Sequence, residues 1–341
     1  MAQRSYSDVL ERQPSPPSIT TPTGAQSDSY TLRAATLERF TDMTSNKTQQ
    51  RSAELEAKLV ADFIRMMEQG TAPWQHPVIK QAGGMPLRAN GESYAGGNVL
   101  TLWMSAIEHG FTARHWMTYN QAKALGGQVR AGEKSRAHIF LPMAIKVQQD
   151  DPSADDKFFM RFKPKAVFNA CQIDGLPDMY QAAPAELRDN PASAPLDAFF
   201  ANCGSSVQLE GSNRCFYRRN TDTIHMPALN RFRSSQSYYA TLAHEHVHWT
   251  GAPHRLDRIK GKAFGDPAYA FEELIAELGS AFLLTGLGVM PCDTASHASY
   301  LENWMQALRD DGSLLRKAAS HASKAAGYMQ DMQQQPTALA A

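Results

Sequence analysis

The feature that most constrains this chain is a pair of histidines four residues apart, His244 and His248, with Glu245 directly after the first. Residues four apart lie on one face of an α-helix, so the two imidazoles can reach a single metal ion. A carboxylate in the position of Glu245 can act as general base toward a water at that metal. The spacing therefore predicts a helix over 235–250 with two metal ligands and Glu245 as the catalytic residue.

The neighbouring sequence favours this helix. Ser234, Ser235 and Ser237 can each cap its first turn, and Gly251 can end it. His246 lies within the same run but projects to another face of the helix, so we expect it to take no part in metal binding.

A third metal ligand is needed, and Glu273 is the favoured candidate. It lies in a mostly apolar helical stretch over 267–285, one turn before Glu277. Two buried carboxylates at this spacing repel each other unless a cation lies nearby. We expect Glu273 on the metal and Glu277 orienting a ligand histidine through its other ring nitrogen. Glu272 is expected to face outward.

The alternative third ligand is His254, which completes the longer pattern H-E-x-x-H-x-x-G-x-x-H. In that pattern Gly251 would turn the chain and His254 would return to the metal. Either candidate gives three protein ligands and an open position, the arrangement of catalytic zinc. The sequence thus predicts one Zn²⁺ per chain, with another divalent metal as an option, and a zinc-dependent peptidase.

Length and composition indicate two domains flanked by tails. Residues 1–46 are rich in Ser, Thr, Pro and Gln, so they are expected to form a disordered tail, as are residues 331–341. Between the tails we expect an α+β domain over 47–175 and, after a linker, a mostly helical domain with a small sheet over 196–330.

Local patterns place the elements within these domains. For the first domain they predict helices over 47–70, 98–109 and 118–125 and strands over 137–147 and 158–169, joined by an acidic hairpin tip at 149–157. For the second they predict strands near 205–209, 214–218 and 222–226 and helices over 235–250, 267–285, 294–308 and 312–330.

Composition excludes several classes of protein. Lys+Arg and Asp+Glu balance at 34 each, so the net charge indicates no partner. No apolar run reaches the about 18 residues of a membrane helix, and the start lacks a secretion signal, so we expect a cytoplasmic protein. The 4 cysteines are far apart and form no C-x-x-C, which argues against a disulfide framework or a cysteine zinc site.

One window of the neutral chain is basic. Residues 71–140 hold seven basic and three acidic side chains, with aromatic residues between them. A surface for single-stranded DNA needs cations for phosphates and rings for unpaired bases, although Trp and Tyr are as often core residues. The candidates for DNA contact are Trp74, Arg88, Tyr94, Asn98, Trp116, Arg130 and Lys134.

A set of motifs runs through both halves of the chain. In the second half they are HEHVHWTG (244–251), Arg255, Arg258 and EELIAELGSAF (272–282); in the first they include Trp74, Gly97-Asn98, Trp116-Met117-Thr118, Gly132-Glu133-Lys134 and Val167-Phe168-Asn169. Over about 50–330 the sequence resembles the plasmid antirestriction proteins of the ArdC type. The resemblance implies an N-terminal domain that binds single-stranded DNA, followed by a zincin-like metallopeptidase domain. It also implies a Glu as third zinc ligand, which favours Glu273 over His254.

The resemblance predicts an antirestriction protein of a mobile element that binds single-stranded DNA without sequence preference. A host restriction enzyme or another protein is a further candidate partner, as the substrate of the zinc site. The main alternative is a zinc-dependent peptidase whose N-terminal domain recruits a protein substrate. A third possibility is a DNA-binding protein whose zinc is structural only.

Overall fold

The computed structural model describes residues 27–146, 158–181, 193–211, 213–258, 267–292 and 297–334. The chain divides into two compact units, Met1–Thr48 and Gln49–Ala341. The described part of the first unit is helical and belongs to α1 (Ser27–Glu68). This helix covers 47–68 of the predicted helix over 47–70 and starts earlier, because 31–40 is rich in strong helix formers. Residues 27–46, which were expected to belong to a disordered tail, are therefore helical. The remaining parts of the predicted tails, 1–26 and 335–341, lie outside the described residues.

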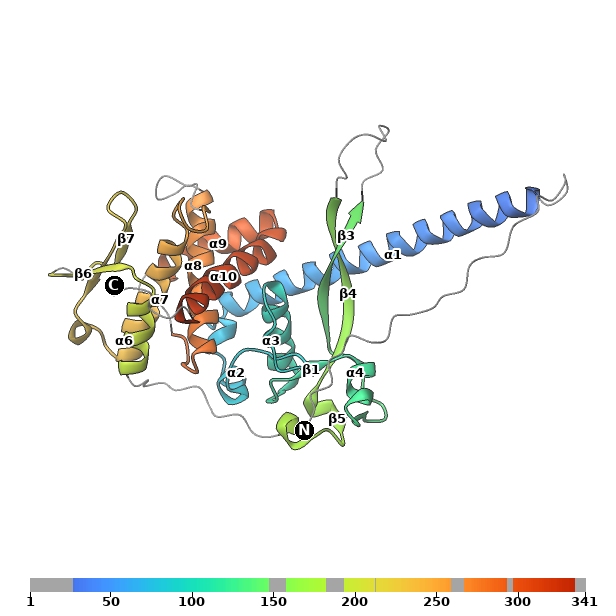
Figure 1. The fold of residues 1–341 in the computed structure, drawn as a ribbon, viewed down its shortest axis with the longest axis horizontal. Coiled ribbons are helices and arrows are strands. Elements are labelled where there is room, and N and C mark those ends of the chain that lie inside the picture. Colours follow the sequence, from blue (N-terminus) through green and yellow to red (C-terminus); the bar gives the residue numbers. More distant parts are fainter. Residues whose placement is uncertain are drawn as a thin grey trace, which may run out of the picture. The chain divides into compact units, whose positions relative to one another are not determined.

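The first half of the second unit combines short helices with one long hairpin (Figure 1). Its helices at 98–109 and 118–125 and both hairpin strands were predicted, whereas the shorter elements hold too few residues to show a period. In chain order the elements are η1 (Pro73–Gln75), α2 (Pro77–Ala82), α3 (Gly97–His109), β1 (Trp116–Met117), α4 (Tyr119–Ala124), β2 (Gln128–Val129), β3 (Ala137–Lys146), β4 (Phe158–Asn169), η2 (Ala170–Gln172), β5 (Ile173–Asp174) and α5 (Asp178–Gln181). The predicted hairpin tip at 149–157 lies outside the described residues.

The hairpin strands β3 and β4 are antiparallel along their whole length, and β1 adds to β4, giving the order β1-β4-β3. Strands β2 and β5 form a separate antiparallel pair. Phe140 lies opposite Pro164, and Pro142 lies opposite Phe162. Because successive residues of a strand alternate between faces, these four side chains share one face of the hairpin.

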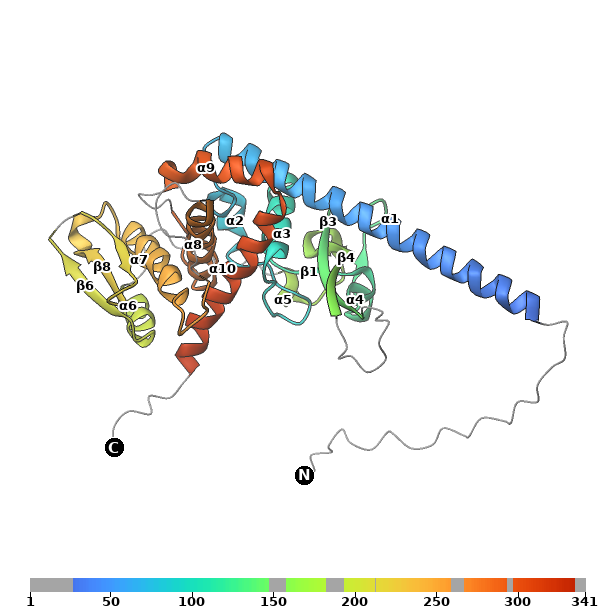
Figure 2. The ribbon, with the colours of Figure 1, turned by 90° about the horizontal axis from the view of Figure 1, so that it is seen from above.

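The second half is mostly helical, with a small sheet ordered β6-β8-β7 in which β6 is parallel and β7 antiparallel to β8. In both views α7 lies between this sheet and α8, and α8 lies between α7 and α10 (Figures 1 and 2). The predicted α+β class is confirmed. The elements are α6 (Ser193–Asn202), β6 (Ser206–Glu210), β7 (Phe216–Arg218), β8 (Thr223–Pro227), η3 (Leu229–Arg231), α7 (Ser235–Thr250), α8 (Pro267–Gly286), α9 (His297–Asp310), α10 (Ser313–Asp331) and η4 (Met332–Gln334).

The hydrophobic core is continuous through both halves of the second unit. Trp103 of α3 packs edge-on against Phe282 of α8, with ring centroids 5.6 Å apart, and both belong to one buried cluster. Helix α10 packs on α8 and α3 through buried alanines such as Ala318 and Ala322. A smaller cluster around Ile173 lies in the first half alone. Within the described ranges, every helix is too short or too polar to cross a membrane.

Candidate metal centre

Helix α7 presents the two motif histidines on its buried side. Of the three candidate serines, Ser234 is the N-cap: its hydroxyl accepts a hydrogen bond from the backbone N–H of Ser237 at 3.1 Å. The helix ends at Gly251, whose φ of −80° is right-handed, so this glycine makes no left-handed turn. The predicted helix over 235–250 is confirmed, and both histidines lie in its second half.

His244, His248 and Glu273 converge on a common point. The two Nε2 atoms lie 3.2 Å apart with the rings at 79°. One carboxylate oxygen of Glu273 is 3.4 Å from His244 Nε2, and the other is 3.3 Å from His248 Nε2. A ligand atom of each residue lies within 4.8 Å of the others, which is the geometry of a three-ligand metal site.

A close approach of α8 to α7 places Glu273 at this depth. Gly279 faces Val247, and a Cβ at Gly279 would lie 2.8 Å from a Val247 methyl carbon. Ser280 ties the same helices together by donating to the backbone oxygen of Ala240 at 3.1 Å. A glycine inside a helix weakens it, but here it allows the two ligand-bearing helices to pack tightly.

Glu272 does not face outward, which corrects the expectation from sequence. It is buried, and its carboxylate lies 3.2 Å from Nδ1 of His248. Arg258 holds it from the other side at 3.0 Å and also donates to the side chain of Thr250 and the backbone of Val247. Helix α8 is covered on this side by the segment after α7, so the apolar pattern alone could not show which glutamate reaches the histidine. In the sequence, the signals of this contact are the adjacent acids Glu272 and Glu273 and the earlier basic residue Arg258.

Glu245 and Glu277 are also buried near the histidines. Burial raises the pKa of Glu245, which the charges of His244 and His248 partly oppose. Burial lowers the pKa of His244, but the hydrogen bond to Glu273 and the charge of Glu277 raise it, and the net shift is upward. Among the described residues Nδ1 of His244 has no hydrogen-bond partner, so the orienting role expected of Glu277 stays a prediction.

The chemistry of this cluster fits a divalent cation. Glu245, Glu273 and Glu277 bring three buried carboxylates together, and Arg258 is already bonded to Glu272. Burial alone would lower the pKa of His248, but the neighbouring Glu273 and Glu272 raise it to about 10. Buried carboxylates need a counter-charge, and a metal ion between the histidine nitrogens and Glu273 would supply it.

The remaining histidines of this region lie elsewhere. The side chain of His254 is 62% exposed and lies 3.3 Å from Asp222, and it is not part of the three-residue group. His246 is buried, with its ring nitrogens 2.8 Å from the Ser205 hydroxyl and 2.7 Å from the Leu242 backbone oxygen. The structure thus gathers Glu273 and not His254 with the histidine pair.

The three aromatic residues expected to stack on DNA bases lie in the core. Trp74 and Trp116 are 1% exposed and Tyr94 is 6% exposed. The Tyr94 hydroxyl donates to the backbone oxygen of Trp116 at 3.1 Å. Rings buried in this way offer no face to a base, which corrects the expectation that they stack on DNA. Residue type and interleaving with charges could not distinguish a packing ring from a binding ring.

The four polar candidates for DNA contact occupy two different places. Arg88 and Asn98 lie near each other, and the Asn98 amide exchanges two hydrogen bonds with the backbone of Phe140 at 2.7 and 3.1 Å. Arg130 is bonded to Glu133 and to the backbone of η2, and the neighbouring Lys134 is exposed. The first pair borders a cavity that also receives cations from the second half.

Two family models match the chain. The model described as the N-terminal domain of anti-restriction factor ArdC matches residues 53–168, and the model described as a zincin-like metallopeptidase matches residues 194–321. The metal-free crystal structure of the antirestriction ArdC protein from plasmid R388 is 42% identical, with a TM-score of 0.67, over 81% of this chain and 97% of that chain. The chain belongs to the ArdC family of antirestriction proteins.

Other relatives of this ArdC-family chain extend the comparison. The Mn(II)-bound structure of the R388 protein is 40% identical, with a TM-score of 0.65, over 82% of this chain and 98% of that one. An uncharacterized protein, y4eC, of Sinorhizobium fredii is 33% identical over 85% of this chain and 96% of its own length. A DNA primase TraC of Escherichia coli is 36% identical over 77% of this chain but only 26% of its own length. In this chain His244, His248 and Glu273 form a group that could hold a metal ion. They lie within the range matched by the zincin-like metallopeptidase model.

Proposed function

We propose that this ArdC-family protein protects incoming plasmid DNA from restriction by binding it as single strands without sequence preference, and that it carries a zinc-dependent peptidase site. The observation that carries the second part is the convergence of two imidazoles and the Glu273 carboxylate beside the buried Glu245. Family membership and the basic window over 71–140 support the first part.

The chemistry of the site follows from its residues. When bound, a zinc ion supplies a Lewis acid that polarises a carbonyl and makes water a better nucleophile at neutral pH. His244, His248 and Glu273 would hold it. Nδ1 of His248 lies 3.2 Å from the Glu272 carboxylate. With a metal bound, His248 would donate its Nδ1–H to Glu272 and present the Nε2 lone pair to the metal, and this bond would fix the ring plane.

Glu245 is suited to move protons in peptide hydrolysis. Burial raises its pKa toward the range in which a carboxylate can both accept and release a proton. It would take a proton from the attacking water and deliver it to the leaving amine. A protein involved in host defence is the candidate substrate.

The DNA-binding part is tested by titrating the full chain with fluorescent single-stranded and duplex oligonucleotides, with and without a chelator. We expect tighter binding to single strands of any sequence, a steep fall with rising salt, and no effect of the chelator. Preference for duplex, or failure to retain oligo-dT, would instead favour a zinc peptidase whose N-terminal half recruits a protein substrate. Protection is tested by conjugative transfer into restricting and non-restricting recipients.

A further inference from the structure

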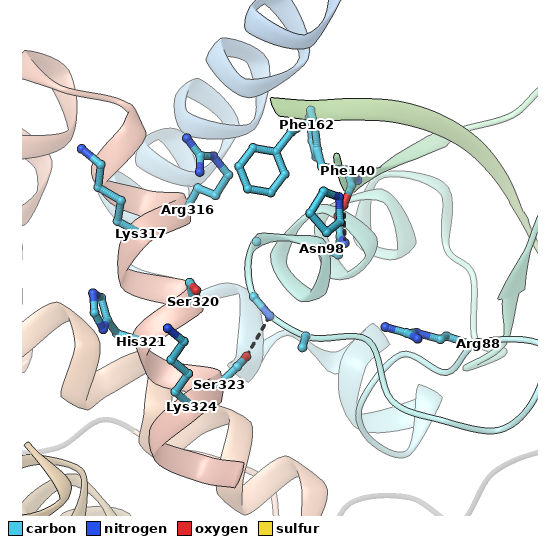
Figure 3. Close-up of a pocket in the computed structure, with 14 residues that line it drawn as sticks. Arg88, Asn98, Phe140, Phe162, Arg316, Lys317, Ser320, His321, Ser323 and Lys324 are labelled. Atoms are coloured by element: carbon cyan, nitrogen blue, oxygen red, sulfur yellow. Dashed lines mark hydrogen bonds between the residues drawn. The ribbon is translucent and has the colours of Figure 1, made fainter. Parts of the chain in front are cut away.

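A cavity of about 550 Å³ lies where the two halves of the second unit meet (Figure 3). One wall is α10, the opposite wall is the face of the β3–β4 hairpin with Phe140 and Phe162, and the floor is the backbone of 95–98 at the start of α3. Arg88 lies across from α10. We call this cavity the α10 groove.

The α10 groove is lined by cations and by no carboxylate. Arg88, Arg316, Lys317 and Lys324 line it, in a chain whose Lys+Arg and Asp+Glu are equal at 34. Three of these cations have carboxylate partners outside the lining, of which the nearest is Glu56, 2.9 Å from Arg316. Partly exposed pairs of this kind contribute little stability, so they can be exchanged for another anion. Among the described residues Lys324 has no ion pair.

The spacing of the cations suits a polymer with several negative charges better than a single anion. Arg316 and Lys324 lie at the two ends of the α10 wall (Figure 3). Eight residues of helix correspond to about 12 Å. Helical DNA carries a phosphate about every 3.4 Å along one strand, so more than one phosphate fits along this wall.

Aromatic side chains face the same space. Phe140 and Phe162 lie on one face of the hairpin, both are only half-buried, and the Arg316 guanidinium lies 4.7 Å from the centre of the Phe162 ring. Proteins that bind single strands contact the phosphates with basic side chains and stack the bases on aromatic rings. The bases of a duplex are already stacked and would not reach these rings.

The floor of the groove allows close approach of a ligand. Gly96 and Gly97 have no side chains, and Gly97 already lies so near Arg316 that a Cβ would come within 3.3 Å of its Cγ. The backbone N–H of Gly96 donates to the Ser323 hydroxyl at 2.8 Å, which fixes the floor to α10. Asn98 fixes it to the hairpin through its two bonds to Phe140. The two walls and the floor are therefore held together before any ligand enters.

We propose that single-stranded DNA lies in the α10 groove, with phosphates on Arg88 and the cations of α10 and a base against Phe162. This inference rests on the proposed function and adds to it that the zincin-like half supplies part of the DNA-binding surface. DNA binding by the first half alone would then be incomplete.

The test uses the full chain and two matched pairs of variants. In the groove, Lys324→Glu removes an exposed cation and Phe162→Ala removes a ring. The controls, Lys123→Glu and Tyr119→Ala, remove an exposed cation and an exposed ring on α4, which does not line the groove. Binding of labelled oligo-dT is measured by fluorescence anisotropy over a range of salt, and metal content and circular dichroism report folding.

We expect each groove variant to bind oligo-dT about tenfold more weakly, since one phosphate contact or one stacked base is lost. Lys324→Glu should also make the salt dependence shallower by about 0.7 in the log–log slope, whereas Phe162→Ala should leave the slope unchanged. The α4 controls should bind within about twofold of the unmodified chain, because they reverse or remove the same groups outside the contact.

Three results would overturn this placement. If the α4 controls weaken binding as much as the groove variants, the DNA lies on another surface, although the proposed function stands. If polyglutamate displaces oligo-dT, and if polyglutamate binds Phe162→Ala as tightly as it binds the unmodified chain, then the ligand of the groove is an acidic polypeptide. An unmodified chain that binds no single strand would remove the DNA part of the proposed function itself.

Discussion

The metal centre takes its ligands from two neighbouring helices and buries them, whereas the α10 groove takes its cations and rings from α10, the hairpin and the loop before α3 and leaves them open to solvent. Burial makes each contact at the metal centre strong and specific in geometry. The groove instead relies on several weak, screened charges and on rings that accept any base. The first arrangement suits one ion and one reaction, and the second suits a polymer of variable sequence.

The largest expected effect is the loss of metal binding when a metal ligand is removed, which tests whether the metal centre and the α10 groove act independently. His248→Ala should abolish stoichiometric metal binding, because one imidazole and one carboxylate leave the site two-coordinate. Metal content after dialysis, measured by mass spectrometry, checks this. Binding of oligo-dT should be unchanged. Full metal occupancy in His248→Ala would disprove the assignment of the ligands.

The next largest effect concerns the reaction and not the metal. Glu245→Gln should retain metal and fold but lower any peptide hydrolysis by about 10²- to 10⁴-fold, because the general base is lost. Hydrolysis of a protein substrate is compared at equal metal content. Should Glu245→Gln empty the site, this residue is a ligand and the roles must be exchanged.

A smaller effect sharpens the description of the metal centre. Glu272→Gln should weaken metal binding by about 10- to 100-fold, because the amide orients His248 less firmly than the carboxylate does. Competition with a chelating dye measures this affinity. Glu277→Gln is the matched control and should weaken it less, since the carboxylate 3.2 Å from Nδ1 of His248 is that of Glu272. If Glu277→Gln weakens metal binding more than Glu272→Gln does, Glu277 and not Glu272 has the orienting role.

The smallest effect lies outside both regions. Arg255 donates to Asp222, and its guanidinium lies 4.0 Å from the centre of the Trp249 ring. These hydrogen bonds lower the pKa of Asp222 to about 2, below the about 3.9 of an unfolded chain. The stabilisation is thus present above about pH 4 and is lost as the pH falls toward 2.

Because the Asp222 side chain is 39% exposed, solvent weakens this contribution. Asp222→Asn should lower the free energy of unfolding by less than about 1 kcal/mol at neutral pH. Urea unfolding should show this difference shrink as the pH falls from about 5 to about 2. Metal content and DNA affinity should not change. A difference that grows in acid would contradict the proposed sign.

The contrast between the two regions also explains what could be predicted from sequence. The helix over 235–250 and its histidines follow from local spacing, and Glu273 follows from the improbability of paired carboxylates in an apolar helix. The sequence could not predict that the Glu272 side chain points inward. Helix α8 is buried on nearly all sides, so its apolar residues do not mark a solvent-exposed face.

The groove was beyond prediction for a different reason. Arg88, Phe162 and Lys324 are far apart in the sequence, and only the packing of α10 against α3 brings them to one cavity. The candidates for DNA contact in the window 71–140 included Arg88 and Asn98, which line this cavity, but also Trp74 and Trp116, which fill the core. Composition counts side chains without their direction, and direction decides between packing and binding.

The contact of Trp103 with Phe282 has a consequence for how such proteins evolve. A recombination event between the halves would join an α3 from one ancestor to an α8 and α10 from another, and the ring pair and the alanine-lined contact would no longer match. Chimeras of this kind should fold poorly, whereas transfer of the whole second unit into a longer gene should be tolerated. Selection is therefore expected to keep both halves linked as a single heritable cassette, even in lineages where only one of the two proposed activities is needed.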